Sequence, residues 1–219
     1  MNLRRIRIFV VDDHPLVREW LGNLLRLQPD FELCGEAEEP GAAAEAIERL
    51  CPDIAIVDLS LRRGSGLDLI KDLHGRCPET KVIVLSMHED ITDILRALRA
   101  GARGYVMKQE SSGQVVTAIR KVLSGQIYAK AEVLAQLAER IVGRPEEESS
   151  GTPETLSDRE LEVFRRLGEG QATRRIADEL GVSPKTVQTY CARIKEKLNM
   201  ANGSELMREA LRWVDAKRL

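Results

Sequence analysis

Acidic side chains follow two apolar segments of the sequence whose composition is typical of buried β-strands. Asp12 and Asp13 come directly after the run Ile6–Val11, and Asp58 comes directly after the run Ile54–Val57. Ligands of parallel sheets bind at the carboxyl ends of the strands, so we expect these three carboxylates to lie together. Close carboxylates repel one another unless a hard cation offsets their charge, and oxygen ligands with retained water suit Mg²⁺. The sequence therefore predicts a Mg²⁺ site.

A hydroxyl and an ammonium group are expected at the same edge of the sheet. Ser86 follows the apolar run at residues 81–85, and Lys108 follows the run Gly104–Met107. A carboxylate nucleophile, a divalent cation and groups that bind the transferred oxygens together make up a phosphoryl-transfer site. The product would be an acyl phosphate, whose reactivity makes the modification reversible.

The elements that must position these groups alternate between short β-branched runs and amphipathic stretches. In the amphipathic stretches apolar residues recur at three- and four-residue spacing, which predicts helices. Repeated strand–helix units indicate an α/β domain with a doubly wound, flavodoxin-like sheet of five parallel strands. We expect strands at residues 6–11, 31–37, 54–57, 81–85 and 104–107. We expect helices at residues 16–27, 42–50, 67–73, 91–100 and 114–123.

A polar segment separates this region from a second group of helices. One helix is expected at residues 130–142, and residues 143–152 then contain helix breakers and nothing to bury, which is typical of a linker. Gly181 and Pro184 indicate a tight turn between two helices, because glycine ends a helix and proline suits its first position. The all-α region would contain four helices, at residues 158–167, 174–180, 184–198 and 205–214, with Ser157, Thr173, Ser183 and Ser204 as N-caps.

Four segments of the first region carry a resemblance to a known family. They are Val10 Val11 Asp12 Asp13 His14 Pro15, Val57 Asp58 Leu59 Ser60, Leu85 Ser86, and Gly104 Tyr105 Val106 Met107 Lys108. With these segments, residues 6–124 resemble the receiver domain of response regulators. The resemblance implies that Asp58 is the phosphoacceptor and that a sensor histidine kinase is the partner that supplies the phosphoryl group.

The same resemblance assigns roles to the other residues of the site. Asp12, Asp13 and the backbone carbonyl of Ser60 would hold Mg²⁺ together with Asp58, while Ser86 and Tyr105 would form the conformational switch. His14 precedes Pro15 and is more typical of a helix start than of an acid–base catalyst, so no catalytic role is assigned to it. In the loop after Asp58, Leu61 Arg62 Arg63 stand where many relatives carry Met-Pro-Gly, which adds two cations and removes a stiffening proline.

The C-terminal region resembles the LuxR-type helix-turn-helix domain. The segments that carry this resemblance are Leu156 Ser157 Asp158 Arg159 Glu160 Leu161 Glu162 Val163, Gly170, Ile176 Ala177, Leu180 Gly181 Val182 Ser183 and Thr186 Val187. Together with the receiver, this is the arrangement of the NarL/FixJ family. We therefore expect a receiver domain at residues 1–128, a helix and linker at 129–152 and a DNA-binding domain at 153–219.

The helix at residues 184–198 is the expected reader of the DNA major groove. Val187, Ile194 and Leu198 would face inward, and polar or cationic residues would occupy the rest of the helix surface. The expected DNA contacts are Lys185, Thr186, Gln188, Thr189, Tyr190, Arg193, Lys195 and Lys197. A homodimer is expected after phosphorylation or on DNA. The last helix carries an apolar stripe that belongs either to the domain core or to a dimer contact. Its residues are Leu206, Met207, Ala210 and Trp213.

The composition favours a cytoplasmic protein. No stretch approaches the ~20 apolar residues of a membrane span, no secretory leader is seen, and the four cysteines are too scattered for a metal site, which favours reduced thiols. Lys and Arg outnumber Asp and Glu by 13 to 11 in residues 153–219, whereas acids exceed bases by 24 to 20 in residues 1–152. The excess of bases is small, so a prediction of DNA binding depends on where the cations cluster.

Two other classes of function compete with that of a phosphorylation-dependent transcription factor. One is a DNA-binding regulator whose receiver responds to dimerisation or a ligand and is never phosphorylated, but Asp12, Asp13, Asp58 and Lys108 are all present. The other is a phosphatase with an aspartyl-phosphate intermediate, but no substrate-specificity cap is seen and the helix-turn-helix would be unexplained. We therefore expect that the protein is not an enzyme and that its only chemistry is its own phosphorylation and dephosphorylation.

Overall fold

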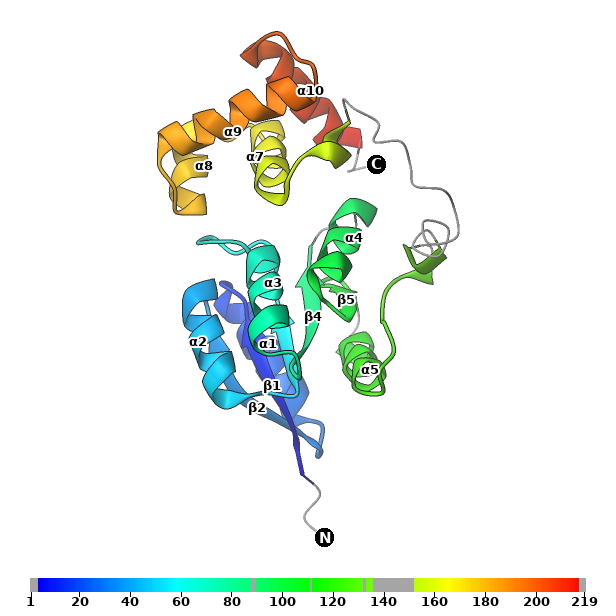
Figure 1. The fold of residues 1–219 in the computed structure, drawn as a ribbon. Helices are drawn as coiled ribbons and strands as arrows, with labels where there is room; N and C mark the ends of the chain where they lie inside the picture. The colour runs from blue at the N-terminus through cyan, green and yellow to red at the C-terminus, as the bar shows by residue number, and fades with distance from the viewer. Residues whose placement is uncertain (1–3, 88–89, 111, 132, 136–151, 217–219) are drawn as a thin grey trace. The chain divides into compact units, whose positions relative to one another are not determined.

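Five parallel strands form one sheet in the computed structural model, which describes residues 4–87, 90–110, 112–131, 133–135 and 152–216 (Figure 1). The strand order is β2-β1-β3-β4-β5, so the carboxyl ends of β1 and β3 are neighbours. The strands are β1 (Ile6–Val11), β2 (Phe31–Ala37), β3 (Ile54–Val57), β4 (Lys81–Ser86) and β5 (Gly104–Met107). The predicted α/β fold with a five-stranded parallel sheet is confirmed.

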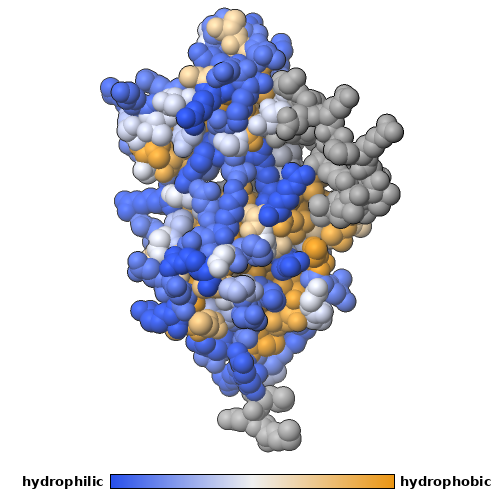
Figure 2. All heavy atoms as spheres, viewed as in Figure 1, coloured by the Kyte–Doolittle hydropathy of each residue, from blue (hydrophilic) through white to orange (hydrophobic). Residues whose placement is uncertain are grey.

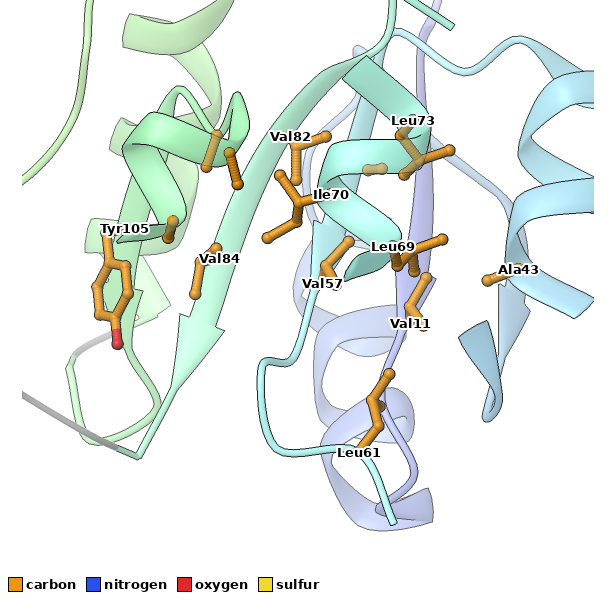
Figure 3. Close-up of a cluster of buried hydrophobic side chains, with 14 of the residues drawn as sticks. Val11, Ala43, Val57, Leu61, Leu69, Ile70, Leu73, Val82, Val84 and Tyr105 are labelled. Atoms are coloured by element: carbon orange, nitrogen blue, oxygen red, sulfur yellow. The ribbon is translucent and has the colours of Figure 1, made fainter. Parts of the chain in front are cut away.

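Helices cover both faces of this sheet, and the alternation of side chains along β1 divides them between two cores. Ile8 and Val10 pack in a cluster with α1 and α5, whereas Phe9 and Val11 pack in a cluster with α2, α3 and α4. Figure 3 shows part of the second cluster, where Leu69 and other side chains of α3 lie near Val11 and Val57. The helices are α1 (Pro15–Arg26), α2 (Pro40–Leu50), α3 (Gly66–Arg76), α4 (Ile91–Ala100) and α5 (Ser112–Leu123).

After α5 the chain returns to the edge of β5. The Tyr128 N–H donates to the Arg103 carbonyl at 2.9 Å, and the Tyr105 N–H donates to the Tyr128 carbonyl at 2.7 Å. Val133 is buried in the cluster that contains Tyr105. This is the start of the helix predicted at residues 130–142, of which residues 131 and 133–135 are helical and residues 132 and 136–142 lie outside the described residues. Of the predicted linker, only Thr152 is described.

A short 3₁₀ helix and four α-helices make up the described C-terminal part. Ser157 begins α7 in a capping box, because its hydroxyl accepts from the Glu160 N–H while the Glu160 side chain accepts from the Ser157 N–H. Gly181 ends α8 in the left-handed conformation and Ser183 caps α9, as expected for a helix-turn-helix. The elements are η1 (Pro153–Thr155), α7 (Asp158–Gly168), α8 (Thr173–Leu180), α9 (Pro184–Lys197) and α10 (Gly203–Ala216).

The predicted helices that fall within the described residues are present, but two of the four predicted N-caps are wrong. Ala172 occupies the N-cap of α8, and Thr173 is already the first helical residue. The helix α10 begins at Gly203, and the Asn202 side chain accepts from the Glu205 N–H at 3.0 Å, so Asn202 takes the capping role expected of Ser204. The physical reason is that a cap depends on where the backbone leaves the extended conformation, and in both cases this occurs earlier than expected.

Tertiary contacts divide the chain into two compact units, Met1–Leu137 and Ala138–Leu219. Hydrophilic residues cover most of the visible surface of both units in Figure 2, and apolar residues gather mainly over the region of β5 and α5. None of the described helices is both long enough and apolar enough to cross a membrane.

Candidate active site and nucleic-acid interface

A buried lysine joins two carboxylates at the carboxyl edge of the sheet. The Lys108 Nζ lies 2.8 Å from Asp58 Oδ2 and 2.7 Å from Asp12 Oδ2, and all three side chains are less than 10% exposed. Burial raises the pKa of the Asp58 carboxyl although Lys108 opposes this effect. Burial disfavours the charged form of Lys108, but the two carboxylates outweigh it and raise the lysine pKa above its ordinary value. Lys108 therefore remains a cation inside the site.

The backbone around Asp58 holds its side chain in a fixed position. The Asp58 N–H donates to the Val11 carbonyl at 2.8 Å, which continues the pairing of β3 with β1. The Ser60 N–H donates to Asp58 Oδ1 at 3.0 Å. At Gly66, the first residue of α3, a Cβ atom would lie only 2.0 Å from the Asp58 carbonyl oxygen. This close approach requires glycine, so the start of α3 is in direct contact with the backbone that follows β3.

An arginine that sequence reasoning missed binds the backbone carbonyl of Asp12. The Arg18 Nη1 donates to the Asp12 backbone carbonyl at 2.7 Å, and its Nη2 pairs with Glu38 in the loop after β2. Arg18 is buried although it lies in the amphipathic helix α1, where an arginine is expected to be solvated. The interaction fixes the end of β1 against the neighbouring loop.

Asp13 lies among cationic and donor groups. The Arg62 backbone N and Nε both lie 3.1 Å from Asp13 Oδ2, and the His14 Nδ1 lies 2.8 Å from Asp13 Oδ1. The His14 N–H also donates to Asp12 Oδ1 at 2.9 Å. His14 lies at the start of α1, as expected, where it is the N-cap residue, and its ring also contacts both acidic residues. No pattern in the sequence predicts the contact between Arg62 and Asp13.

The acidic residues form a group that could hold a metal ion. One ligand atom from each of Asp12, Asp13, His14 and Asp58 can be chosen so that all lie within 4.8 Å of one another. A cluster of buried carboxylates around a small space is the kind of donor set that a hard divalent cation binds. The structure therefore brings together the three carboxylates that the sequence predicted as metal ligands.

The two predicted switch residues lie on the neighbouring strands. Ser86 is fully buried at the end of β4, and its carbonyl accepts from the Lys108 N–H at 2.8 Å. Tyr105 on β5 is 4% exposed and packs in the same core cluster as Val84, as Figure 3 shows. The tyrosine ring is therefore already inside the domain in this state.

The outer surface of α9 carries the candidate DNA contacts. The Val187, Ile194 and Leu198 side chains are buried, as predicted for the inward face of this helix. Five of the expected contact residues are exposed on it, namely Lys185, Gln188, Thr189, Arg193 and Lys197. Two of these five have partners inside the domain, because the Thr189 hydroxyl donates to the Lys185 carbonyl at 3.0 Å and Lys197 pairs with Glu160. The other three are partly covered: the Thr186 hydroxyl lies 2.8 Å from that of the Ser183 cap, Tyr190 packs on the core, and Lys195 is half-buried.

Comparisons with known proteins agree with this geometry. Residues 8–120 match the family model of the response regulator receiver domain, and residues 154–210 match that of the bacterial regulatory proteins of the LuxR family. This chain is a two-component response regulator with a LuxR-type DNA-binding domain. It is a transcription regulator and belongs to a family that is not catalytic, as the sequence predicted.

Full-length relatives share both domains of this response regulator. The chain is 31% identical to the transcriptional regulatory protein DegU of Brevibacillus brevis over 99% of this chain and 98% of the relative. It is 32% identical to the oxygen regulatory protein NreC of Staphylococcus haemolyticus over 94% and 97%. A structure of RcsB from Salmonella enterica serovar Typhimurium, bound to the promoter rprA in the presence of the phosphomimetic BeF3-, is 26% identical with a TM-score of 0.64 over 94% and 98%.

The candidate dimer stripe of the response regulator divides into core and surface. Leu206 and Ala210 are buried in the helix-turn-helix core, so they are not available as surface contacts in this fold. Trp213 packs partly on the same core, with its ring 5.7 Å from that of Phe164. Met207 is 42% exposed, and Leu211, which sequence reasoning did not select, is 49% exposed.

Proposed function

We propose that Asp58 is the phosphoacceptor of this response regulator and that its phosphorylation by a sensor histidine kinase controls DNA binding. The observation that carries the proposal is the position of the Lys108 ammonium, 2.8 Å from the Asp58 carboxylate in a buried acidic site. An Asp58 oxygen would bond to phosphorus while the bond from phosphorus to the donor imidazole breaks. The imidazole keeps that electron pair, and Lys108 would bind an oxygen of the transferred group.

Mg²⁺ is the cation proposed for the acidic group, with Asp12, Asp13, Asp58 and the backbone carbonyl of Ser60 as its ligands. When bound, it would offset the repulsion between the carboxylates and the incoming phosphoryl group. Other residues of the chain hold these ligand groups in position. Arg18 holds the backbone of Asp12, Ser60 holds one oxygen of Asp58, and Lys108 joins the two carboxylates.

A shift between two conformations would carry the signal away from Asp58. We assign the switch to Ser86, which would move toward the phosphoryl oxygens, and to Tyr105, whose ring is already buried and would shift further into the vacated space. The Tyr105 N–H is bound to the Tyr128 carbonyl, so a movement of β5 reaches the segment that leads out of the receiver. The surface formed by α4 and β5 would change, promoting dimerisation or releasing the DNA-binding domain.

In the DNA-binding domain, α9 is the proposed major-groove helix. Gln188, Thr189 and Arg193 are exposed there and would lie nearest the base edges, while Lys185 would contact phosphate. Among the expected DNA contacts, Lys195 and Lys197 are also candidates for binding phosphate. For Lys197, the ion pair with buried Glu160 supports a structural role instead.

The response regulator is proposed to act as a homodimer on two inverted half-sites. The exposed large apolar residues of α10, Met207 and Leu211, are four positions apart and so share one helix face, which is the accessible apolar surface there.

We propose domain limits of 1–128 for the receiver and 153–219 for the DNA-binding domain, with the helix and linker at 129–152. A regulator of transcription acts where the chromosome is, so we propose a location in the bacterial cytoplasm.

Phosphate labelling tests the assignment of Asp58. Wild-type protein should take up label from a small acyl phosphate donor such as acetyl phosphate in the presence of Mg²⁺, and should take up none when EDTA removes the metal beforehand. Asp58→Asn should abolish the labelling, because the amide cannot act as the nucleophile. Asp53→Asn is the matched control, since Asp53 precedes β3 and pairs with Arg4 and the Arg7 backbone instead. Robust Mg²⁺-dependent labelling of Asp58→Asn would refute the proposal.

A further inference from the structure

Two arginines in the loop after β3 are bound to different neighbours. The Arg62 Nε lies 3.1 Å from Asp13 Oδ2, at the end of β1. The Arg63 Nη1 lies 2.9 Å from Glu39, the N-cap residue of α2. The loop is thus held by two ion pairs, one to the acidic group and one to the start of α2. Only Arg62 contacts a carboxylate of the acidic group itself.

The contacts of Asp13 make its carboxylate a poor free ligand in this state. Oδ2 faces both the backbone N and the Nε of Arg62, and Oδ1 faces the His14 ring nitrogen. The Asp13 side chain is 6% exposed, so a cation that approaches it must compete with these groups. The Arg62 side chain is 70% exposed, so its guanidinium can turn into solvent while Asp13 Oδ2 keeps the hydrogen bond from the Arg62 backbone N–H. It is therefore a cation that can be displaced.

We propose that Arg62 is an internal competitor for the divalent cation at Asp13. The guanidinium occupies the carboxylate in the metal-free protein and leaves it when the metal binds, so the arginine lowers the metal affinity of the site. This inference rests on the proposed Mg²⁺ site. By linkage, the metal must weaken the contact between Arg62 and Asp13 by the same factor as Arg62 weakens metal binding. The concentration of free Mg²⁺ that is needed for phosphorylation of this receiver would then be higher with Arg62 than without it.

Calorimetric titration of the full-length protein with Mg²⁺ tests this competition. Arg62→Gln should bind Mg²⁺ about three- to fivefold more tightly than wild type, the size expected for one exposed ion pair. Arg63→Gln is the matched control, because it removes the same charge from the same loop but breaks the pair with Glu39. It should change the dissociation constant less than twofold. Asp13→Asn should weaken binding and make the Arg62→Gln effect disappear in the double variant.

The outcomes separate this inference from the proposed metal site. If Arg62→Gln binds Mg²⁺ like wild type, or if Arg63→Gln tightens binding equally, the competitor role is wrong while the metal site stands. If none of the proteins binds Mg²⁺, both are wrong. A second readout follows the side chain itself by NMR. Mg²⁺ should shift the Arg62 Nε–H signal, assigned by its loss in Arg62→Gln, and leave the Arg63 signal in place.

Discussion

Replacing Lys197 by methionine should destabilise the DNA-binding domain without removing a phosphate contact. The Lys197 Nζ lies 2.6 Å from Glu160, whose side chain is 4% exposed. Removing one partner of a fully buried pair costs about 3–5 kcal/mol, whereas an exposed pair contributes at most about 1 kcal/mol. Lys197 is 41% exposed, so water screens the pair, and Glu160 keeps its hydrogen bond from the Ser157 N–H. We therefore expect a loss of about 1–2 kcal/mol.

Tryptophan fluorescence can follow this loss in the full-length protein. The chain has two tryptophans, Trp20 in α1 and Trp213 in α10. In a Trp20→Phe background the remaining indole, which packs on Phe164, reports on the DNA-binding domain alone. For a domain of this size a urea m-value of about 1 kcal/mol/M converts the expected loss into a midpoint shift of about 1–2 M.

The salt dependence of DNA binding decides between the two roles of Lys197. Lys185 is exposed at the start of the same helix and is the matched control. Lys185→Met should lower the slope of log affinity against log salt by about 0.9, the value for one phosphate contact. Lys197→Met should leave the slope unchanged at a temperature where the domain is folded. The structural role is wrong if Lys197→Met lowers the slope as Lys185→Met does and leaves the Trp213 midpoint unchanged.

Two further predictions concern the same domain. Burial opposes ionisation of Glu160, but Lys197 and the Ser157 backbone outweigh it and lower the Glu160 pKa. The ionised Glu160 therefore stabilises the folded domain fully above the ordinary glutamate pKa of about 4.3, and this stabilisation is lost as the pH falls below that value. Glu160→Gln has no carboxylate to protonate. The urea midpoint reported by Trp213 should therefore fall less steeply with decreasing pH in Glu160→Gln than in wild type. Gln188→Ala should relax base preference at one position by about 1–3 kcal/mol, measured by selection from random duplexes, and an unchanged preference profile would contradict its role in base reading.

The layout of the acidic site could be predicted because sheet geometry alone brings its residues together. Asp12, Asp13 and Asp58 follow strands that are neighbours in the sheet, and the ends of parallel strands lie at one edge. No knowledge of the loops was needed. The partners of these residues were not predictable in the same way. Arg62 meets Asp13 across 49 positions of sequence only because of the path that the loop after β3 takes.

Buried charges were the least predictable feature, since an amphipathic pattern assigns charged residues to the solvent side. Arg18 and Glu160 both lie in amphipathic helices and are both buried, because each is paired with a side chain from a distant segment, Glu38 for Arg18 and Lys197 for Glu160. Burial of a charge is tolerated when it is paired and hydrogen-bonded, and pairing is a property of the tertiary structure. The periodicity that located α1 and α7 therefore carried no information about these two side chains.

The rotation of α10 shows how a backbone contact selects one of two adjacent helix faces. Leu206 with Ala210 and Met207 with Leu211 both follow the four-residue spacing of a helix stripe, so either pair is suited to the core. A Cβ atom at Gly168 of α7 would lie 2.3 Å from the Ala210 carbonyl oxygen. Such an approach fits only glycine, and it turns the face with Ala210 toward α7. Met207 and Leu211 are thereby left at the surface, so a contact between two such domains through α10 must use this second face.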